Sequence, residues 1–320
     1  MDTVNPVLDY YSEAASMTLG GKHARRLTSL PERIDALCKC VQKLFIYDVV
    51  AKDFYGYGIP KNRLGEIHLR STASLLDKIV LRSDEPLTEP RDVKKRVIGR
   101  CNHFVLLAVA ALRAHEMPAR ARSGFGAYFN PPKYEDHWVC EYWDARKGQW
   151  SFADVQFDQV WIDKLHIRHN VADVPRDQFL TAGEAWKVCR ARKLDPELFG
   201  IEFAKLRGLW FIAASLIRDA AALNKVEMLP WDSWGAQPQL NAALGPDELA
   251  FFDELAELAA NPDRTLDELR NRYDTDARVQ VPDKVLNLLR QRMEPVGVQV
   301  ARSATGARGA EPESTPSSAR

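Results

Sequence analysis

Residues 101–115 constrain the fold of this chain more than any other part of the sequence. Nearly all of them are apolar, and alanines stand between larger side chains such as Phe104 and Leu107. Hydrophobic residues therefore occur on every side of the predicted helix, which is typical of a helix buried all around. Pro118 predicts where this helix ends, because the residue before a proline disfavours the helical conformation. We expect a buried helix that begins at Cys101.

Three strand patterns follow this helix. Residues 119–125 alternate small and charged side chains, and residues 137–143 are aromatic and β-branched. Residues 149–154 form a third strand that returns after a turn at 144–148. The predicted fold class is α+β, with the buried helix packed on an antiparallel sheet and with helical N- and C-terminal extensions.

Helix-start signals lie on both sides of this core. Ser29-Leu-Pro-Glu32 predicts a helix that runs to about residue 52, and Thr181-Ala-Gly-Glu184 predicts another. Further helices are expected at 72–81, at 206–223, at 247–260 and after Pro282. We therefore divide the chain into a catalytic domain with N-terminal helices (1–175), a helical region packed on it (176–300) and a tail (301–320). The Ala, Ser, Gly, Pro and Arg composition of the tail predicts disorder.

The charge balance excludes two classes of partner. The 320 residues include 44 Lys and Arg and 44 Asp and Glu. A chain without a basic excess lacks the broad positive surface that binds nucleic acid or an anionic membrane. No stretch reaches the ~18 apolar residues of a membrane span, and residues 1–19 lack the pattern of an export signal.

The five cysteines predict free thiols. They lie at positions 38, 40, 101, 140 and 189, an odd number with irregular spacing, so a disulfide framework is not expected. Cys38 and Cys40 are too close for the usual zinc-binding spacing, and there is no second pair. We predict no metal and no cofactor, and the cytoplasm as the compartment.

Cys101 is the candidate nucleophile. A thiol at a helix N-terminus lies at the positive end of the helix dipole, which favours the reactive thiolate. His137 begins one predicted strand and Asp154 ends the next, which would place them on neighbouring strands. Cys, His and Asp can then act as nucleophile, base and orienting group.

These residues also carry a resemblance to a known family. The relevant segments are Gly99-Arg-Cys-Asn-His-Phe104, Ala119-Arg120, Asp136-His-Trp-Val-Cys-Glu-Tyr-Trp143 and Trp150-Ser-Phe-Ala-Asp154. Together they resemble the core of the transglutaminase-like superfamily over about residues 92–160. The resemblance implies a papain-like core in which Cys101, His137 and Asp154 occupy the catalytic positions.

Some features depart from the family pattern or leave alternatives open. Val155 and Gln156 follow the aspartate where Pro or Thr is frequent, so Asp158 competes for the orienting role. The Gly-Arg-Cys start is also similar to the peptide:N-glycanase branch, whose paired zinc cysteines this chain lacks. His103 is interpreted as a helix-surface or core histidine. Glu141 is either a second acid near His137 or a solvent-facing charge.

The substrate is expected to be a peptide or a small amide. Residues 125–132 are predicted to form a mobile aromatic loop, and we select Phe125, Tyr128 and Trp138 as substrate-binding candidates. The resemblance implies acyl transfer through a thioester at Cys101, with hydrolysis favoured. Transfer to an amine in a biosynthetic pathway and an inactive binding protein on the same fold are the alternatives. The oligomeric state is left open.

Overall fold

A long antiparallel hairpin forms the centre of the structure, a computed structural model that describes residues 5–298. Strands β3 (Ala119–Asn130) and β4 (Lys133–Asp144) pair from Ala119 opposite Tyr142 to Gly126 opposite Glu135. The antiparallel sheet predicted around this hairpin is confirmed. Further strands extend it: β5 (Gln149–Ala153) antiparallel to β4, β6 (Phe179–Thr181) antiparallel to β3, β7 (Phe199–Ile201) parallel to β4, and β8 (Leu206–Arg207) antiparallel to β7.

The tip of the hairpin differs from the prediction. Residues 125–132 were predicted to be a loop, but β3 continues to Asn130 and β4 resumes at Lys133. The regular register is interrupted between Gly126 and Asn130. The aromatic side chains of this segment, Tyr128 and Phe129, pack against the cluster that contains Phe157. Side-chain packing thus holds this segment as a strand extension.

The buried helix begins and ends close to the predicted positions. Helix α6 spans Cys101–Ala114, and every side chain from Cys101 to Arg113 is buried. At its start, His103 Nδ1 accepts a hydrogen bond from the backbone N–H of Arg100 (2.9 Å). Each fully buried Leu, Val or Phe of such a helix contributes about 1.5–3 kcal/mol from removal of apolar surface from water. Helix α6 therefore anchors the core between the sheet and the N-terminal helices.

The N-terminal part consists of more and shorter elements than the sequence predicts. Helix α3 (Ile34–Val41) ends early, and the predicted continuation to residue 52 is wrong. Strand β1 (Phe45–Tyr47) instead pairs in parallel with β2 (Val97–Gly99), and this distant pairing overrides the helical spacing of the sequence. The other helices here are α1 (Pro6–Ser12), α2 (Ala24–Leu27), α4 (Ala51–Tyr55) and α5 (Thr72–Arg82), the last as predicted. Short 3₁₀ turns span Gly21–His23, Lys61–His68 and Val93–Lys95.

The C-terminal part is mainly helical. Thr181 caps α8 (Ala182–Arg190) with the predicted capping box. The predicted helix after Pro282 is wrong: β10 (Lys284–Asn287) and β11 (Arg292–Pro295) form a small antiparallel sheet with β9 (Asp232–Ser233), so pairing with a strand about fifty residues away decides the local structure. The remaining elements are α7 (Gln159–Leu165), a 3₁₀ turn (Pro196–Leu198), α9 (Leu209–Leu223), α10 (Pro246–Ala260) and α11 (Leu266–Thr275). The predicted tail lies outside the described residues.

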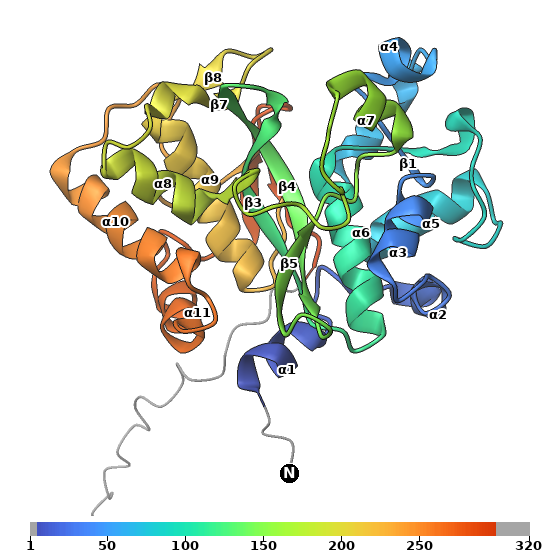
Figure 1. Ribbon diagram of the computed structural model, residues 1–320, viewed down its shortest axis with the longest axis horizontal. Helices are drawn as coiled ribbons and strands as arrows, with labels where there is room; N and C mark the ends of the chain where they lie inside the picture. Colours follow the sequence, from blue (N-terminus) through green and yellow to red (C-terminus); the bar gives the residue numbers. More distant parts are fainter. Residues whose placement is uncertain (1–4, 299–320) are drawn as a thin grey trace, which may run out of the picture.

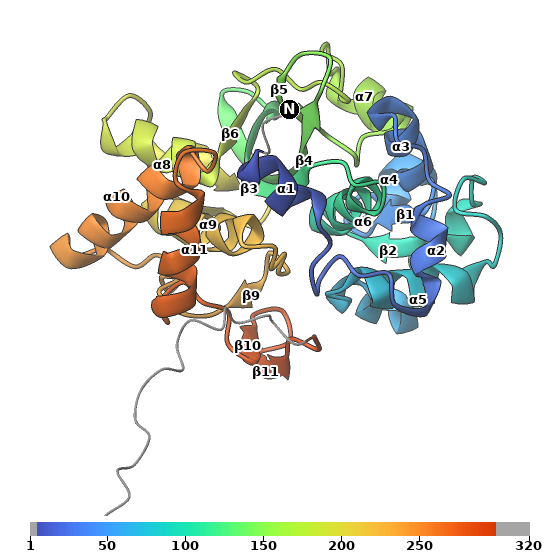
Figure 2. The ribbon, with the colours of Figure 1, turned by 90° about the horizontal axis from the view of Figure 1, so that it is seen from below.

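The two groups of helices lie on opposite sides of the central strands. Helix α6 and helices α2 to α5 lie on one side of β3 and β4, α8 to α11 lie on the other, and α1 lies at the lower end of the strands (Figure 1). A view turned by 90° shows the same separation, with the sheet of β9, β10 and β11 at the edge of the molecule (Figure 2). The C-terminal region thus covers one side of the sheet, while the division into domains stays a prediction.

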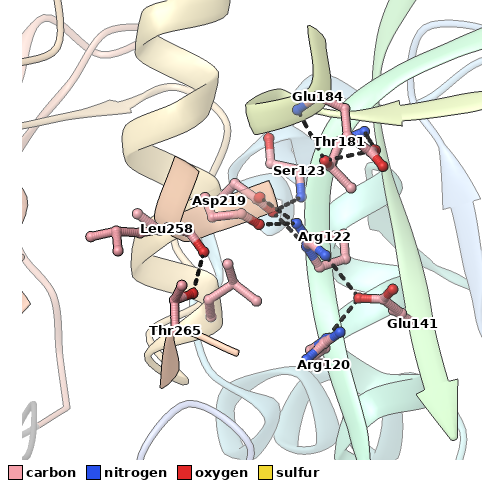
Figure 3. A network of polar contacts seen from close by, with 12 residues as sticks. Arg120, Arg122, Ser123, Glu141, Thr181, Glu184, Asp219, Leu258 and Thr265 are labelled. Carbon is pink, nitrogen blue, oxygen red and sulfur yellow. Dashed lines mark hydrogen bonds and ion pairs between the residues drawn. The ribbon is translucent and has the colours of Figure 1, made fainter. Parts of the chain in front are cut away.

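A buried network of ion pairs joins α9 to the sheet (Figure 3). Both oxygens of Asp219 on α9 accept from Arg122 on β3 (3.0 and 2.9 Å), and one of them also accepts from the Ser123 backbone N–H (2.9 Å). Glu141 on β4 accepts from Arg122 (2.8 Å) and from Arg120 (2.6 Å). Glu141 is therefore a buried structural carboxylate, which corrects its interpretation as a solvent-facing charge.

We expect the Asp219→Ala substitution to destabilise the fold strongly. Removing Asp219 leaves Arg122, which is 2% exposed, with only the carboxylate of Glu141, which it shares with Arg120. Breaking such a buried pair costs about 3–5 kcal/mol. Urea unfolding measures the effect. Glu254→Ala is the matched control, because it removes an acid–arginine pair whose carboxylate is largely exposed and costs roughly 0–1 kcal/mol. Equal effects of the two substitutions would contradict the role given to this network.

Candidate active site

Cys101 occupies the first position of α6, directly after strand β2. It is buried, with 5% of its surface exposed. The strand pairing that places Tyr47 opposite Gly99 brings β1 beside the start of the helix. The preceding residue, Arg100, forms a bidentate ion pair with Asp48 (2.9 and 2.8 Å). These contacts fix the turn from which the thiol projects.

His137 lies on β4 and contacts Asp154 at the end of β5. Its Nε2 atom is 2.8 Å from Asp154 Oδ2, and both side chains are buried. The register that places Cys140 opposite Ala153 brings the two residues together. The rings of Phe129 and Phe157 flank the imidazole, with centroids 4.9 and 5.4 Å away. The sequence prediction of a His137–Asp154 contact thus agrees with the geometry.

Asp154 is held by two further donors. The phenol of Tyr128 donates to Oδ2 (2.8 Å), and the backbone N–H of Gln156 donates to Oδ1 (3.1 Å). The backbone N–H of Asp154 in turn donates to the carbonyl of Val171 (2.7 Å). Several hydrogen-bond donors hold a carboxylate in a fixed orientation. Asp154 is therefore well placed to orient His137.

Asp158, the competing aspartate, has a different environment. It is the N-cap of α7, where it accepts from the backbone N–H groups of Val160 (3.1 Å) and Trp161 (3.4 Å). It also accepts from Tyr55 (2.9 Å) and from Lys43 (3.2 Å). These contacts account for Asp158 as a capping residue, and the structure brings Asp154, not Asp158, to His137.

The electrostatics of His137 favour the charged imidazolium. Burial by itself lowers the pKa of His137, but the charge and hydrogen bond of Asp154 raise it, and a hydrogen bond with Cys101 adds to this. The net effect raises the pKa of His137 to about 10. Because Asp154 engages Nε2, Nδ1 is the ring nitrogen that is left for Cys101. The arrangement can therefore hold a proton between the sulfur and the ring at neutral pH.

The three substrate-binding candidates lie in packed surroundings. Phe125 is fully buried against Phe199 and Phe211, and Trp138 belongs to the same large core cluster. Tyr128 contacts Asp154, as described above, and thus acts on the orienting group. Substrate binding by Phe125, Tyr128 and Trp138 stays a prediction.

Several neighbours of the site could not be predicted from the sequence. Cys101 is among the groups that act electrostatically on Tyr47 and Arg218. Ser215 on α9 contacts Asp136, the residue before His137. They come from segments far apart in the chain, so no local motif could have identified them. His103 is a core histidine, which resolves that alternative: burial lowers its pKa to about 4, and its Nε2 lies 3.1 Å from the carbonyl of Leu69.

Neither a metal cluster nor a membrane-spanning helix is found in the described part of the chain. Within residues 5–298, no three His, Cys, Asp or Glu side chains are grouped so that they could hold a metal ion. None of the helices in that range is long and apolar enough to cross a bilayer. All five cysteines are unpaired.

Part of this chain is similar to a known superfamily of proteins. Residues 70–155 match the family model of the transglutaminase-like superfamily, which confirms the resemblance seen in the sequence. No curated protein matches the chain. A solved structure of a putative cysteine protease from Cytophaga hutchinsonii is similar, with 17% identity and a TM-score of 0.32. That match covers 48% of this chain and 43% of the other, so the chain spans less than half of that neighbour.

The two aspartates can be separated by substitution. Asp154→Ala should slow alkylation of Cys101 by iodoacetamide several-fold, because His137 loses its orienting partner. Asp158→Ala should leave that rate unchanged and instead cost about 0.5–2 kcal/mol of stability through the lost helix cap. Mass spectrometry of the Cys101 peptide and thermal unfolding measure the two effects. A slower reaction in Asp158→Ala alone would overturn the assignment of Asp154.

The pH dependence of alkylation tests the Cys101–His137 pair. His137 keeps its proton below a pH of about 10, so the imidazolium can stabilise a thiolate at pH 6, where ordinary thiols near 8.5 are protonated. Cys101 should therefore react faster at pH 6 than the more exposed Cys40. In His137→Ala this advantage should fall by roughly tenfold or more. Unchanged rates would show that the imidazole does not act on the sulfur.

The same proton links the stability of the fold to pH. The pKa of His137 is higher in the folded protein than its ordinary value of 6.5. Its contribution is therefore fully present below pH 6.5 and is lost as the pH rises towards 10. Urea unfolding at several pH values should show a weaker decline over this range in His137→Ala than in the wild type. Parallel declines would contradict the raised pKa.

Proposed function

We propose that this protein cleaves an amide or ester bond of a peptide or small amide through a thioester at Cys101, with water as the favoured acceptor. The observation that carries the proposal is the hydrogen-bonded pair of His137 and Asp154, whose imidazole also contacts Cys101. A thiol at a helix start beside an oriented imidazole is the arrangement that nucleophilic cysteine catalysis needs.

In the first step the sulfur of Cys101 attacks the substrate carbonyl carbon. A carbon–sulfur bond forms, and the carbonyl electrons move to oxygen, which becomes an oxyanion. The positive end of α6 favours this negative charge. The oxyanion then collapses, the carbon–nitrogen bond breaks, and His137 gives its proton to the leaving amine. The products are a free amine and an acyl group bound to Cys101 as a thioester.

In the second step His137 acts as a base. It takes a proton from water, whose oxygen attacks the thioester carbonyl, and the carbon–sulfur bond breaks. The acid is released, and Cys101 and His137 regain their initial state. Asp154 keeps the imidazole in one orientation through both steps, with Tyr128 and Gln156 holding the carboxylate. If an amine replaces the water, the same groups form a new amide.

We propose that the protein works in a reducing compartment such as the cytoplasm. The chemistry requires Cys101 as a free thiol, and all five cysteines of the chain are unpaired. A reducing environment keeps such thiols from being oxidised.

Trapping the acyl-enzyme tests the proposal. We expect p-nitrophenyl acetate to add one acetyl group to Cys101 and to release nitrophenol in a burst, after which the acetyl group is lost to water. Cys101→Ala should show neither, whereas Cys189→Ala, which removes another buried thiol, should behave as the wild type. Intact-mass and peptide mass spectrometry follow the acetyl group.

The same experiment separates the alternatives. Free acetate as the main product supports hydrolysis, whereas transfer to an added primary amine in preference to water would identify an acyltransferase. A folded wild-type protein that never acylates at Cys101 would contradict the proposal and favour a binding protein.

A further inference from the structure

Arg218 is a buried cation without a carboxylate partner. It lies on α9, is 4% exposed, and forms no ion pair with any acid among residues 5–298. Its Nη2 donates to Ser215 Oγ (2.9 Å), and its Nη1 has a long contact with Gln237 Oε1 (3.4 Å). Its Nε is buried without a hydrogen-bond partner. Of the five N–H donors of a guanidinium, most are therefore not satisfied by strong acceptors.

Two other arginines, one on β3 and one directly before α6, are paired with carboxylates. Arg122 donates to both oxygens of Asp219, and Arg100 donates to both oxygens of Asp48. Burying a charged group is costly unless a counter-charge and hydrogen bonds compensate for it. Burial accordingly lowers the pKa of Arg218, and more distant negative charges offset this only in part. Arg218 thus lacks the anion that its neighbours have.

The position of Arg218 connects it to the candidate active site. Ser215, which accepts from Arg218, donates to Asp136 Oδ1 at 3.5 Å. Asp136 directly precedes His137 on β4. The negative charges that act on Arg218 are those of Asp136, Asp232 and Cys101. Two hydrogen bonds therefore link the guanidinium, through Ser215, to the residue that precedes His137.

We propose that Arg218 binds a carboxylate of the substrate, so that the preferred substrate is an amide or ester with a carboxylate near the reacting carbonyl. This inference rests on the proposed function of Cys101. The planar guanidinium matches the geometry of a carboxylate and can bind it through two parallel hydrogen bonds. Gln237 supplies a second donor, because its side-chain nitrogen is also buried without a partner. The substrate then provides the counter-charge that the free protein lacks.

A pair of alkylating reagents tests this without knowledge of the natural substrate. Iodoacetate and iodoacetamide have the same shape, but only iodoacetate carries a carboxylate. Each reacts with the thiolate by forming a sulfur–carbon bond as iodide leaves. The measured quantity is the ratio of the two rates at Cys101, divided by the same ratio for glutathione. Taking this ratio within one variant cancels any general change in thiol reactivity.

We expect the ratio to exceed one in the wild type and to fall by roughly tenfold in Arg218→Met, because a charge-assisted contact is lost. Arg218→Lys keeps a cation and should retain part of the preference, which provides a second test if Arg218→Met folds poorly. Arg190→Met is the matched control: it removes an arginine paired with Asp253 on the far α8–α10 surface and should leave the ratio unchanged.

The outcomes separate the two proposals. If Cys101 reacts with iodoacetamide but the ratio is the same in the wild type and in both Arg218 variants, the carboxylate role of Arg218 is wrong and the cysteine chemistry stands. If both reagents slow equally in Arg218→Met, the guanidinium acts on the thiolate and not on a substrate carboxylate. A Cys101 that reacts with neither reagent would overturn the proposed function and this inference with it.

Discussion

The contact between Arg122 and Asp219 is the interaction on which the arrangement of the two halves depends. Both side chains are buried, so their charges are compensated by each other, by Glu141, by the backbone N–H of Ser123 and by the carbonyl of Ala259. A buried ion pair adds little net stability but tolerates few alternative arrangements, because any shift leaves a charge unpaired. It therefore fixes the position of α9 against β3, and with it the distance between α9 and the catalytic strand.

The position of α9 matters for the site because neighbouring polar residues of this helix contact different parts of the sheet. Asp219 points to the sheet and compensates Arg122, whereas Arg218 and Ser215 lie towards Asp136 beside His137. The same helix thus supplies a carboxylate to one buried arginine and leaves its own arginine without a carboxylate partner. A region that the sequence suggested only as a helical cover therefore contributes polar groups to the surroundings of the catalytic residues.

The sequence predicted the parts of the fold that depend on local patterns. The apolar residues of α6, the strand alternation around His137 and the capping box at Thr181 each act within one element, and each is found in the structure. The pairing of β1 with β2 and of β9 with β10 joins segments about fifty residues apart, and no local pattern encodes it. The same limit applies to the site: the Cys, His and Asp order was visible, but Arg218 was not.

The burial of His137 bears on the order of proton transfers. Phe129 and Phe157 exclude water from the ring, which on its own would favour the neutral imidazole. Asp154 reverses this, because it is buried with three donors and supplies a fixed negative charge at 2.8 Å, and the pKa of His137 rises to about 10. At neutral pH the imidazole therefore carries a proton. In the mechanism that we propose, this proton passes to the leaving amine, so His137 acts first as an acid and only afterwards as the base that activates water.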